Sequence, residues 1–260
     1  MFDSGFGGLT VARALIDLLP GEDLIYLGDT ARYPYGPRPL SEVGGFAHQI
    51  AEELVECRGV KLLVVACNTA AAAALDELRD RFDVPVIGVI EPGVRSLVQA
   101  SETGRVAVIG TVGTINSGAY QRAFESVGDD MELIALACPG FVEFVERGEF
   151  ESEQVHVLAQ RLLGPAVDAK VDTLLLGCTH YPYLARTIGD VMGRDVVLVS
   201  SADETAFEVR RVMIDAGMVR TRADGGQASF ITTGDVNWFE ELGRRLLGPE
   251  LERAEQMLWD

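Results

Sequence analysis

Positive charge is scarce in this chain. Its 260 residues include 22 lysine and arginine residues against 40 aspartate and glutamate residues, which gives a formal net charge of -18 at pH 7. No basic stripe interrupts this acidic composition. Because nucleic acids and most membrane surfaces are polyanionic, they repel a protein of this charge. The composition therefore argues against a nucleic-acid partner and against a role at a membrane surface.

Long apolar runs and closely paired cysteines are also missing. There is no signal peptide and no stretch of about 18 uninterrupted apolar residues, so we expect a cytoplasmic protein. The four cysteines, at positions 57, 67, 138 and 178, form no Cys-x-x-Cys pair. In a reducing compartment this spacing indicates free thiols, with neither a disulfide framework nor a zinc site. We therefore expect no bound metal.

Apolar, strand-like runs alternate with amphipathic, helix-like segments along the chain. At 260 residues and 48% hydrophobic composition, the chain can bury one large core or two cores of moderate size. We predict strands near 23–27, 61–66, 84–90, 105–110, 131–137, 173–177, 196–200 and 228–232. We predict helices near 9–19, 41–57, 69–82, 115–126, 151–169, 182–192, 203–216 and 236–247. This alternation predicts an α/β fold with mainly parallel sheets flanked by helices.

Two of the four cysteines share a sequence context. Cys67 lies in Lys61-Leu-Leu-Val-Val-Ala-Cys-Asn-Thr69, and Cys178 lies in Thr173-Leu-Leu-Leu-Gly-Cys-Thr-His180. Each segment reads as a buried parallel strand, a cysteine, a short polar pair and then a helix. The repetition indicates a distant internal duplication and two pseudo-symmetric lobes. We predict one lobe at 1–93 plus 204–260, carrying Cys67, and another at 94–203, carrying Cys178, with the site between them.

Thiols at the carboxyl ends of two equivalent strands suggest a particular chemistry. Open α/β sheets place their ligands at these strand ends, where loops and helix N-termini converge. Asn68 or Thr69 can cap the helix after Cys67, and Pro182 suits the first turn of the helix after His180. Such helix N-termini attract carboxylates and should lower a nearby thiol pKa below its usual value of about 8.5. Two facing thiols could remove a proton from one face of a carbon and return it to the other.

Two further segments are candidate parts of the same site. The run Asp3-Ser-Gly-Phe-Gly-Gly8 places a carboxylate at a strand end and glycines just before a helix, so the backbone can approach a ligand closely. The run Asp29-Thr-Ala-Arg-Tyr-Pro-Tyr-Gly36 is a turn-rich loop after the strand at 23–27. This loop could close over a ligand. Asp29, Thr30 and Arg32 could equally form no more than a capped turn.

Five short motifs occur along the chain. They are Asp3-Ser-Gly with Gly7-Gly8, Gly28-Asp-Thr-Ala-Arg, Pro34-Tyr-Gly36, Ala66-Cys-Asn-Thr-Ala70 and Gly177-Cys-Thr-His-Tyr-Pro182. In content and order this set resembles the signature of the cofactor-independent glutamate racemases, and the resemblance extends over essentially the whole chain. It implies interconversion of L- and D-glutamate without a cofactor, for peptidoglycan synthesis and hence for cell-wall biogenesis and cell shape. The partner it implies is the small-molecule substrate glutamate, and a homodimer is compatible with it.

Carried over position by position, the resemblance implies roles for individual residues. Cys67 and Cys178 would be the two acid/base residues, Cys67 acting on D-glutamate and Cys178 on L-glutamate. The substrate site would be lined by Asp3, Ser4, Tyr35, Gly36, Asn68, Thr69, Thr111, Thr114, Thr179 and His180. Glu146 would support His180, although its acidic surroundings alone would indicate solvated surface. Thr111 and Thr114 could otherwise be plain helix caps.

Three other functions stay open from the residues themselves. The first is a racemase or decarboxylase of the same superfamily that acts on another acid, such as aspartate. The second is a cysteine hydrolase that uses Cys178 with His180, which would leave Cys67 unexplained. The third is a two-lobed, non-catalytic protein that binds dicarboxylates. A pyridoxal phosphate enzyme is not expected, because the only lysines, Lys61 and Lys170, lie at the sheet edge opposite the cysteines.

Two expectations concern residues outside the proposed chemistry. Free cysteine is among the most buried residue types, so Cys57 and Cys138 are interpreted as packing residues. Only Met1 and Phe2 precede Asp3, whereas a parallel strand of about five residues should lead into this position. We therefore expect a shortened first strand, and we expect apolar residues added upstream to stabilise the protein.

Overall fold

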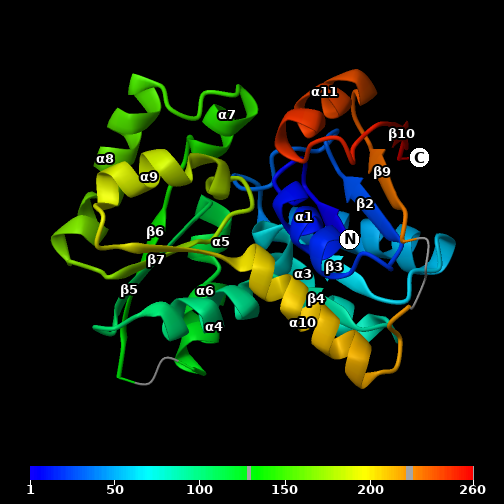
Figure 1. The fold of residues 1–260 in the computed structure, drawn as a ribbon, viewed down its shortest axis with the longest axis horizontal. Helices are drawn as coiled ribbons and strands as arrows, with labels where there is room; N and C mark the ends of the chain where they lie inside the picture. Colours follow the sequence, from blue (N-terminus) through cyan, green and yellow to red (C-terminus); the bar gives the residue numbers. More distant parts are fainter. Residues whose placement is uncertain (128–129, 221–224, 260) are drawn as a thin grey trace.

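Two parallel β-sheets lie side by side and form the centres of two lobes in the computed structural model of the chain (Figure 1). The structure describes residues 1–127, 130–220 and 225–259. The first sheet has the strand order β10-β9-β2-β1-β3-β4 and contains β1 (Phe2–Asp3), β2 (Leu24–Gly28), β3 (Leu63–Val65), β4 (Val86–Gly88), β9 (Ala228–Thr232) and β10 (Ala254–Gln256). The second sheet has the order β6-β5-β7-β8 and contains β5 (Arg105–Gly110), β6 (Glu132–Ala137), β7 (Thr173–Leu176) and β8 (Val197–Ser200). All pairings between these described strands are parallel, which confirms the predicted fold class.

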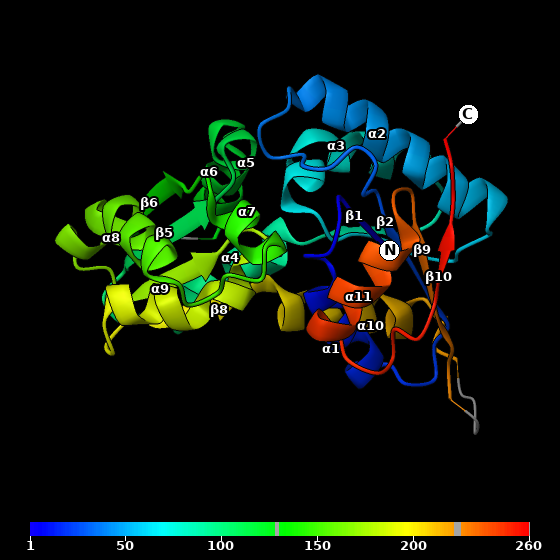
Figure 2. The ribbon, with the colours of Figure 1, turned by 90° about the horizontal axis from the view of Figure 1, so that it is seen from above.

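Helices cover both faces of the first sheet (Figure 2). On one face lie α2 (Leu40–Glu52), which continues into a π-helical turn at Glu53–Cys57, and α3 (Asn68–Arg81). On the other face lie α1 (Leu9–Leu18), α10 (Ser201–Asp215) and α11 (Val236–Leu246). Alternate residues of β3 serve the two layers, because Leu63 and Val65 belong to the core beside α2 and α3 and Val64 belongs to the other core. Burial on both faces explains why the central strand β3 is apolar throughout.

The second sheet is covered in the same way. One face carries α7 (Phe141–Glu146), α8 (Glu153–Asp168), the 3-10 turn η2 (Tyr181–Leu184) and α9 (Ala185–Met192). The other face carries α4 (Ile90–Ala100) and α6 (Ala119–Glu125), and α5 (Val112–Asn116) connects β5 to α6. Val106 and Val108 of β5 face α4 and α6, whereas Ala107 and Ile109 face the opposite layer. No helix within the described ranges is long and apolar enough to cross a membrane.

The two sheets share an arrangement of four strands. The order β2-β1-β3-β4 in the first sheet matches β6-β5-β7-β8 in the second, so β1 corresponds to β5 and β3 to β7. Cys67 follows β3 and Cys178 follows β7; likewise Asp3 ends β1, and Thr111 follows β5. The strands β9 and β10 extend the first sheet alone. This correspondence supports the predicted duplication and places the two thiols at equivalent strand ends.

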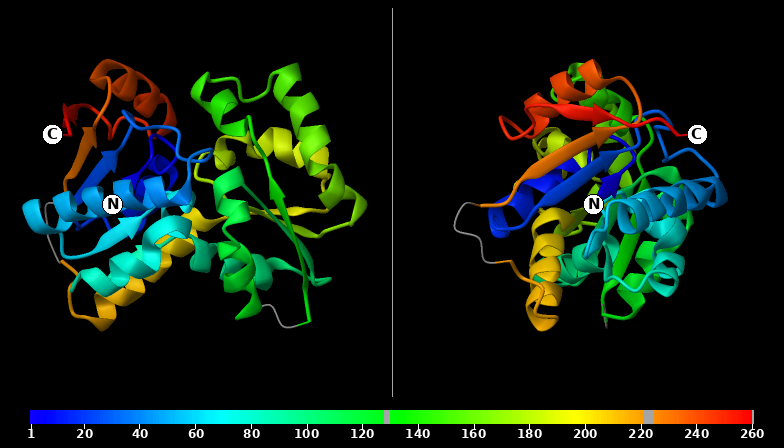
Figure 3. Two further views of the ribbon diagram at one scale, coloured as in Figure 1. Left: turned by 180° about the vertical axis from the view of Figure 1, so that it is seen from behind. Right: turned by 90° about the vertical axis from the view of Figure 1, so that its right-hand side faces the viewer.

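The chain passes from the first sheet to the second through α4 and returns at the start of α10 (Figure 3). The predicted strand near 84–90 was too long, because β4 ends at Gly88 and α4 begins at Ile90. The boundary predicted at 91–93 therefore falls inside a helix. Pro92 is tolerated there because the first-turn amides of a helix have no intrahelical acceptor. The predicted return near residues 200–203 coincides with the end of β8 and the first residues of α10.

Four other segments differ from the sequence prediction, and one of them is β10, which was not predicted. The helix predicted at 115–126 is divided into α5 and α6, because Gly118 adopts a φ of 72°, in the left-handed region that glycine tolerates best. The helix predicted at 182–192 begins as the 3-10 turn η2 before α9. The helix α7 was not predicted, because its six residues are too few to show a clear apolar period.

The first strand, β1, is two residues long but pairs on both sides, with β2 and β3. The amino group of Met1 donates a hydrogen bond to the Ile25 carbonyl at 2.7 Å, and burial lowers its pKa to about 5. A cavity of about 800 Å³ adjoins this end of the sheet and is lined in part by Met1, Leu24 and Leu62. The expected gain in stability from apolar residues added upstream stays a prediction.

Candidate active site

A cavity of about 80 Å³ lies between the carboxyl ends of the two sheets. Residues of both lobes line it, including the two thiols that follow β3 and β7. The predicted site residues that line this cavity are Ser4, Tyr35, Gly36, Cys67, Asn68, Thr69, Thr111, Cys178, Thr179 and His180. Asp3, Thr114 and Glu146 do not line it, but each is hydrogen-bonded to a residue that does. The predicted residues therefore form one connected region, in which Asp3, Thr114 and Glu146 lie behind the residues that line the cavity.

Cys67 occupies the N-cap position of α3 and is 5% exposed. Its pKa is raised to about 12, first by burial and then by the charge of Asp3, while a hydrogen bond from the Ala70 amide and one from the Ser4 hydroxyl oppose this rise. The expected net fall of this pKa is therefore wrong, although the Ala70 amide at the helix N-terminus acts in the predicted direction. The cost of burying a thiolate exceeds the stabilisation that the amides and the hydroxyl supply. The expected side-chain cap is also wrong, because α3 begins at Asn68 and has no side-chain capping hydrogen bond.

Cys178 lies in the second lobe beside a histidine and a carboxylate. Its Sγ is 3.9 Å from Nδ1 of His180, and Nε2 of His180 is 3.0 Å from Oε1 of Glu146. Burial favours the neutral imidazole, but the contacts with Cys178 and Glu146 outweigh it and raise the pKa of His180 well above its usual value. Glu146 comes from α7 and its side chain is only 9% exposed. His180 therefore lies between Cys178 and Glu146 and contacts both.

Asp3 connects the first lobe to the segment that carries Cys178. Its carboxylate accepts a hydrogen bond from the Thr179 hydroxyl at 3.1 Å and another from the Gly5 amide at 3.1 Å. The glycine-rich segment passes very close to this point, since a Cβ placed on Gly7 would lie 2.3 Å from Thr179 Oγ1 and 2.4 Å from His180 Nδ1. Only glycine fits there without displacing the site. The glycine run was predicted to approach a ligand, whereas here it approaches the side chains of Thr179 and His180, and a close approach to a ligand stays a prediction.

Hydroxyl groups join the two lobes on another side of the cavity. The Thr69 hydroxyl oxygen lies 3.1 Å from those of Thr111 and Thr114, which lie 2.9 Å from each other. Thr111 also caps α5, since its side chain accepts a hydrogen bond from the Thr114 amide. Both interpretations of Thr111, as a helix cap and as a residue lining the cavity, are therefore compatible with the structure. The hydroxyl of Thr114 is buried behind it.

Several residues of the cavity wall were not predicted. Cys138 was interpreted as a packing residue, and it is buried, but it also lines the cavity, and burial with the nearby Cys178 raises its pKa to about 12. Tyr33 and Glu143 line the cavity as well. Tyr120, which was not predicted either, stands behind the wall, and its hydroxyl accepts a hydrogen bond from the side-chain amide of Asn68 at 2.7 Å. The sequence could have indicated Cys138 by its position, because it directly follows the strand β6, much as Cys67 closely follows β3.

Replacing Glu146 by glutamine should lower the pKa of His180, because the carboxylate that favours the imidazolium is lost. A raised histidine pKa stabilises the folded state in full below about pH 6.5 and ceases to do so as the pH rises through the folded-state value. The stability difference between wild type and E146Q should therefore be largest near about pH 6 and shrink at higher pH. NMR titration of the three histidines measures the shift, with His48 and His156 as internal references.

The control for E146Q is Glu143→Gln, on the same helix, because the structure gives Glu143 no hydrogen bond to His180. We expect E143Q to change the His180 titration much less than E146Q. An unchanged His180 titration in E146Q would contradict the assigned contact.

The fold and the cavity together define a class of protein. It is a two-lobed α/β enzyme in which duplicated strands each present a thiol to one shared cavity, an arrangement suited to proton transfer at carbon. The family model described as Asp/Glu/hydantoin racemase matches residues 9–208, and the chain belongs to this family.

Individual glutamate racemases are similar to this chain over nearly their full length. The chain is 54% identical over 252 residues to the glutamate racemase of Parafrankia sp. (strain EAN1pec), covering 96% of this chain and 91% of that protein. Its structure is similar to that of glutamate racemase isoform RacE1 from Bacillus anthracis, with a TM-score of 0.93, 40% identity, and coverage of 100% and 96% of the two chains. It is also similar to the Francisella tularensis glutamate racemase in complex with D-glutamate, with a TM-score of 0.90, 32% identity, and coverage of 98% and 95%.

Proposed function

We propose that this protein interconverts L- and D-glutamate by proton transfer at the α-carbon, with Cys67 and Cys178 as the two acid/base groups. The observation that carries the proposal is that both thiols, from equivalent strands of duplicated lobes, line one cavity. A reaction that inverts a carbon and runs in both directions needs one such group on each face. The glutamate racemases among its relatives support the choice of substrate.

The raised pKa of Cys67 has a consequence for this chemistry. With a pKa near 12, Cys67 is a thiol at neutral pH in the unliganded protein. The substrate carries an ammonium group, and a positive charge that enters the buried cavity favours a thiolate within a few ångströms. A base of high pKa is also a stronger proton acceptor, which suits an α-proton as weakly acidic as that of an amino acid. Substrate binding would therefore favour transfer of the Cys67 proton to the neighbouring Asp3 carboxylate, which leaves the thiolate that removes the α-proton.

Stabilisation of the carbanion would come from preformed hydrogen-bond donors. The first amides of α3 have no intrahelical acceptor, and the hydroxyls of Thr69 and Thr111 line the same cavity. Such groups are fixed before the reaction begins and act in a site from which the substrate excludes water. On the other face, Glu146 and His180 would hold and return the proton that Cys178 exchanges.

D-Glutamate made in this way would supply peptidoglycan synthesis in the cytoplasm and so contribute to cell-wall biogenesis and cell shape. The residues proposed to bind substrate are those predicted from the sequence, with Asp3 and Thr114 acting from behind the cavity wall. We propose no cofactor.

The proposal is tested by following the loss of the circular dichroism signal of L-glutamate with no added cofactor. Enzyme dialysed against a chelator and hydroxylamine should retain full activity, iodoacetamide should abolish it, and glutamate should protect. Turnover of aspartate but not glutamate would favour another member of the family. Hydrolysis of an ester or amide would favour the cysteine hydrolase, and binding without turnover would favour a binding protein.

A further inference from the structure

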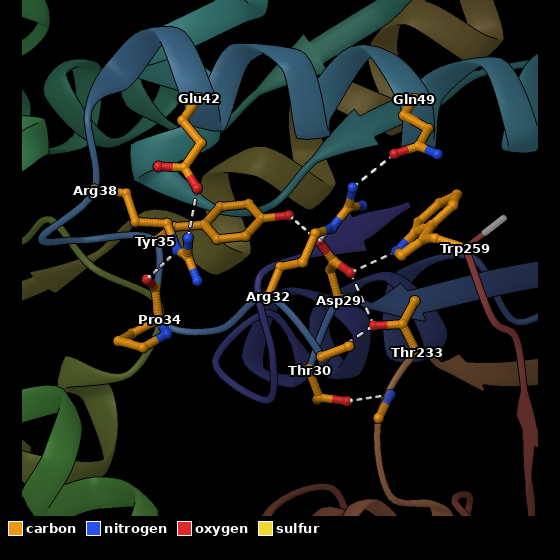
Figure 4. A network of polar contacts seen from close by, with 12 residues as sticks. Asp29, Thr30, Arg32, Pro34, Tyr35, Arg38, Glu42, Gln49, Thr233 and Trp259 are labelled. Carbon is orange, nitrogen blue, oxygen red and sulfur yellow. Dashed lines mark hydrogen bonds and ion pairs between the residues drawn. The ribbon is translucent and has the colours of Figure 1, made fainter.

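The loop between β2 and α2 forms one wall of the cavity, and its other side is held by a buried carboxylate. Residues 33–37 of this loop line the cavity, Tyr35 and Gly36 among them. Asp29, directly after β2, is fully buried beneath the loop (Figure 4). Its carboxylate accepts hydrogen bonds from four different side chains. They are Arg32 (Nε, 2.6 Å), Tyr35 (Oη), Thr233 (Oγ1, 2.8 Å) and Trp259 (Nε1, 2.9 Å).

One of these donors comes from the far end of the chain. Trp259 follows β10, the edge strand of the first sheet, which pairs with β9. Its indole donates to Asp29 and also stacks on Arg32, whose guanidinium lies 4.4 Å from the Trp259 ring centre and 4.3 Å from that of Phe46. A cation between two aromatic faces, beside a buried carboxylate, is held by both electrostatics and packing. Figure 4 shows Trp259 and Tyr35 approaching Asp29 from opposite sides.

The same loop continues to the second lobe. The Gly36 carbonyl accepts a hydrogen bond from the Gly113 amide of α5 at 3.0 Å. A Cβ on Gly36 would lie 2.9 Å from the Cβ of Thr111, so the loop and the second lobe are in tight contact. A continuous chain of contacts therefore runs from Trp259 through Asp29 and Tyr35 to the interface between the lobes. Displacement of Trp259 would loosen the wall at the point where both lobes meet.

We propose that Trp259 is a positioning residue of the active site. Through its hydrogen bond to Asp29 and its stacking on Arg32, the C-terminal segment fixes Tyr35 and Gly36 against the second lobe and keeps the cavity closed around the two thiols. The proposal deepens the proposed racemase function and rests on it for its kinetic readout alone.

Trp259→Phe is the decisive variant, because it removes the N–H donor and keeps an aromatic ring over Arg32. In W259F the wall should open more often, so iodoacetamide should modify Cys67 and Cys178 about three to ten times faster, the factor that corresponds to the loss of one hydrogen bond of typical net strength. Cys57 is exposed and does not line the cavity, so its rate serves as an internal reference. Peptide mass spectrometry gives the rate for each thiol. This readout needs no enzymatic activity.

The matched control is Leu258→Ala, in the neighbouring position, because Leu258 is 73% exposed. L258A should leave all alkylation rates and the kinetic constants unchanged. W259F should raise KM for glutamate about three- to tenfold while kcat falls less than about twofold. The reason is that the loop would contact the bound substrate equally in the ground state and in the transition state. A lower melting temperature with unchanged thiol rates and unchanged KM would show that Trp259 only stabilises the fold, and would overturn the proposal.

A double-mutant cycle with Tyr35→Phe tests the path through Asp29. Because both side chains donate to the same carboxylate, the effect of W259F and Y35F together on kcat/KM should be clearly smaller than the product of the two single effects. Multiplicative effects would overturn the path through Asp29. If wild type itself does not racemise glutamate, the proposed function fails, while the thiol rates still decide the role of Trp259.

Discussion

Cys67→Ser and Cys178→Ser should each abolish net racemisation of glutamate, lowering kcat by at least about 10³-fold, within the range reported for general acid–base catalysis. Both directions need one deprotonation and one reprotonation, on opposite faces of the α-carbon. Since each thiol comes from its own lobe, neither can take over the other's face. A serine hydroxyl has nearly the shape of the thiol but is a far weaker acid, so the loss is chemical and the fold is preserved.

A glutamate with a leaving group at the β-carbon separates the two half-reactions. Once the α-proton is removed, the electron pair forms a carbon–carbon double bond and expels the leaving group, so no reprotonation is needed. With Cys178 intact, C67S should still eliminate from the L-analogue. With Cys67 intact, C178S should still eliminate from the D-analogue. The opposite enantiomer should be strongly impaired in each variant, as measured by the elimination rate.

The matched control for both variants is Cys57→Ser, because Cys57 is exposed in the π-helical turn after α2 and should not affect either reaction. If either C67S or C178S treats the two enantiomers alike, or racemises glutamate at nearly the wild-type rate, the assignment of one thiol to each face is wrong.

Gly7→Ala should lower kcat/KM for glutamate by about 10²-fold, the loss expected when catalytic groups are displaced by about 1 Å. The added Cβ would lie 2.3 Å from Thr179 Oγ1 and 2.4 Å from His180 Nδ1, so both side chains must move. These are the neighbours of Cys178, and Thr179 also holds Asp3. The free energy of unfolding should fall by only about 1–3 kcal/mol, as in other overpacked sites. Activity should therefore be lost well before stability is.

Gly45→Ala provides the control for this substitution. A Cβ on Gly45 would meet no atom within 4 Å, and the residue lies inside α2, where alanine is favoured over glycine by about 1 kcal/mol. We expect G45A to be slightly more stable than wild type and equally active. Kinetics and thermal denaturation of the two variants side by side check both expectations, and near wild-type activity in G7A would contradict the close packing of the glycine run against the site.

The elements that carry the two thiols were predictable from the sequence because their pattern is local. An apolar run that ends in a cysteine and a polar pair shows the strand, its end and the following helix within nine residues, and both copies appear in the structure as β3–α3 and β7–η2–α9. Parallel pairing followed from the alternation of strand and helix. The α4 helix was missed because Pro92 and Gly93 look like a boundary, although proline is acceptable in a first helical turn.

Only the tertiary structure decided the pKa of Cys67 and the long-range contacts that hold the side chains of the site in place. The expected fall in the pKa of Cys67 was wrong because burial and Asp3 outweigh the helix amides, and no sequence pattern shows how completely a thiol is removed from water. Glu146 reads as surface in the sequence but is buried against His180. The contact of Trp259 with Asp29 joins residues 230 positions apart. A sequence shows which local structure each segment favours, whereas desolvation and long-range hydrogen bonds depend on which distant groups the folded chain brings together.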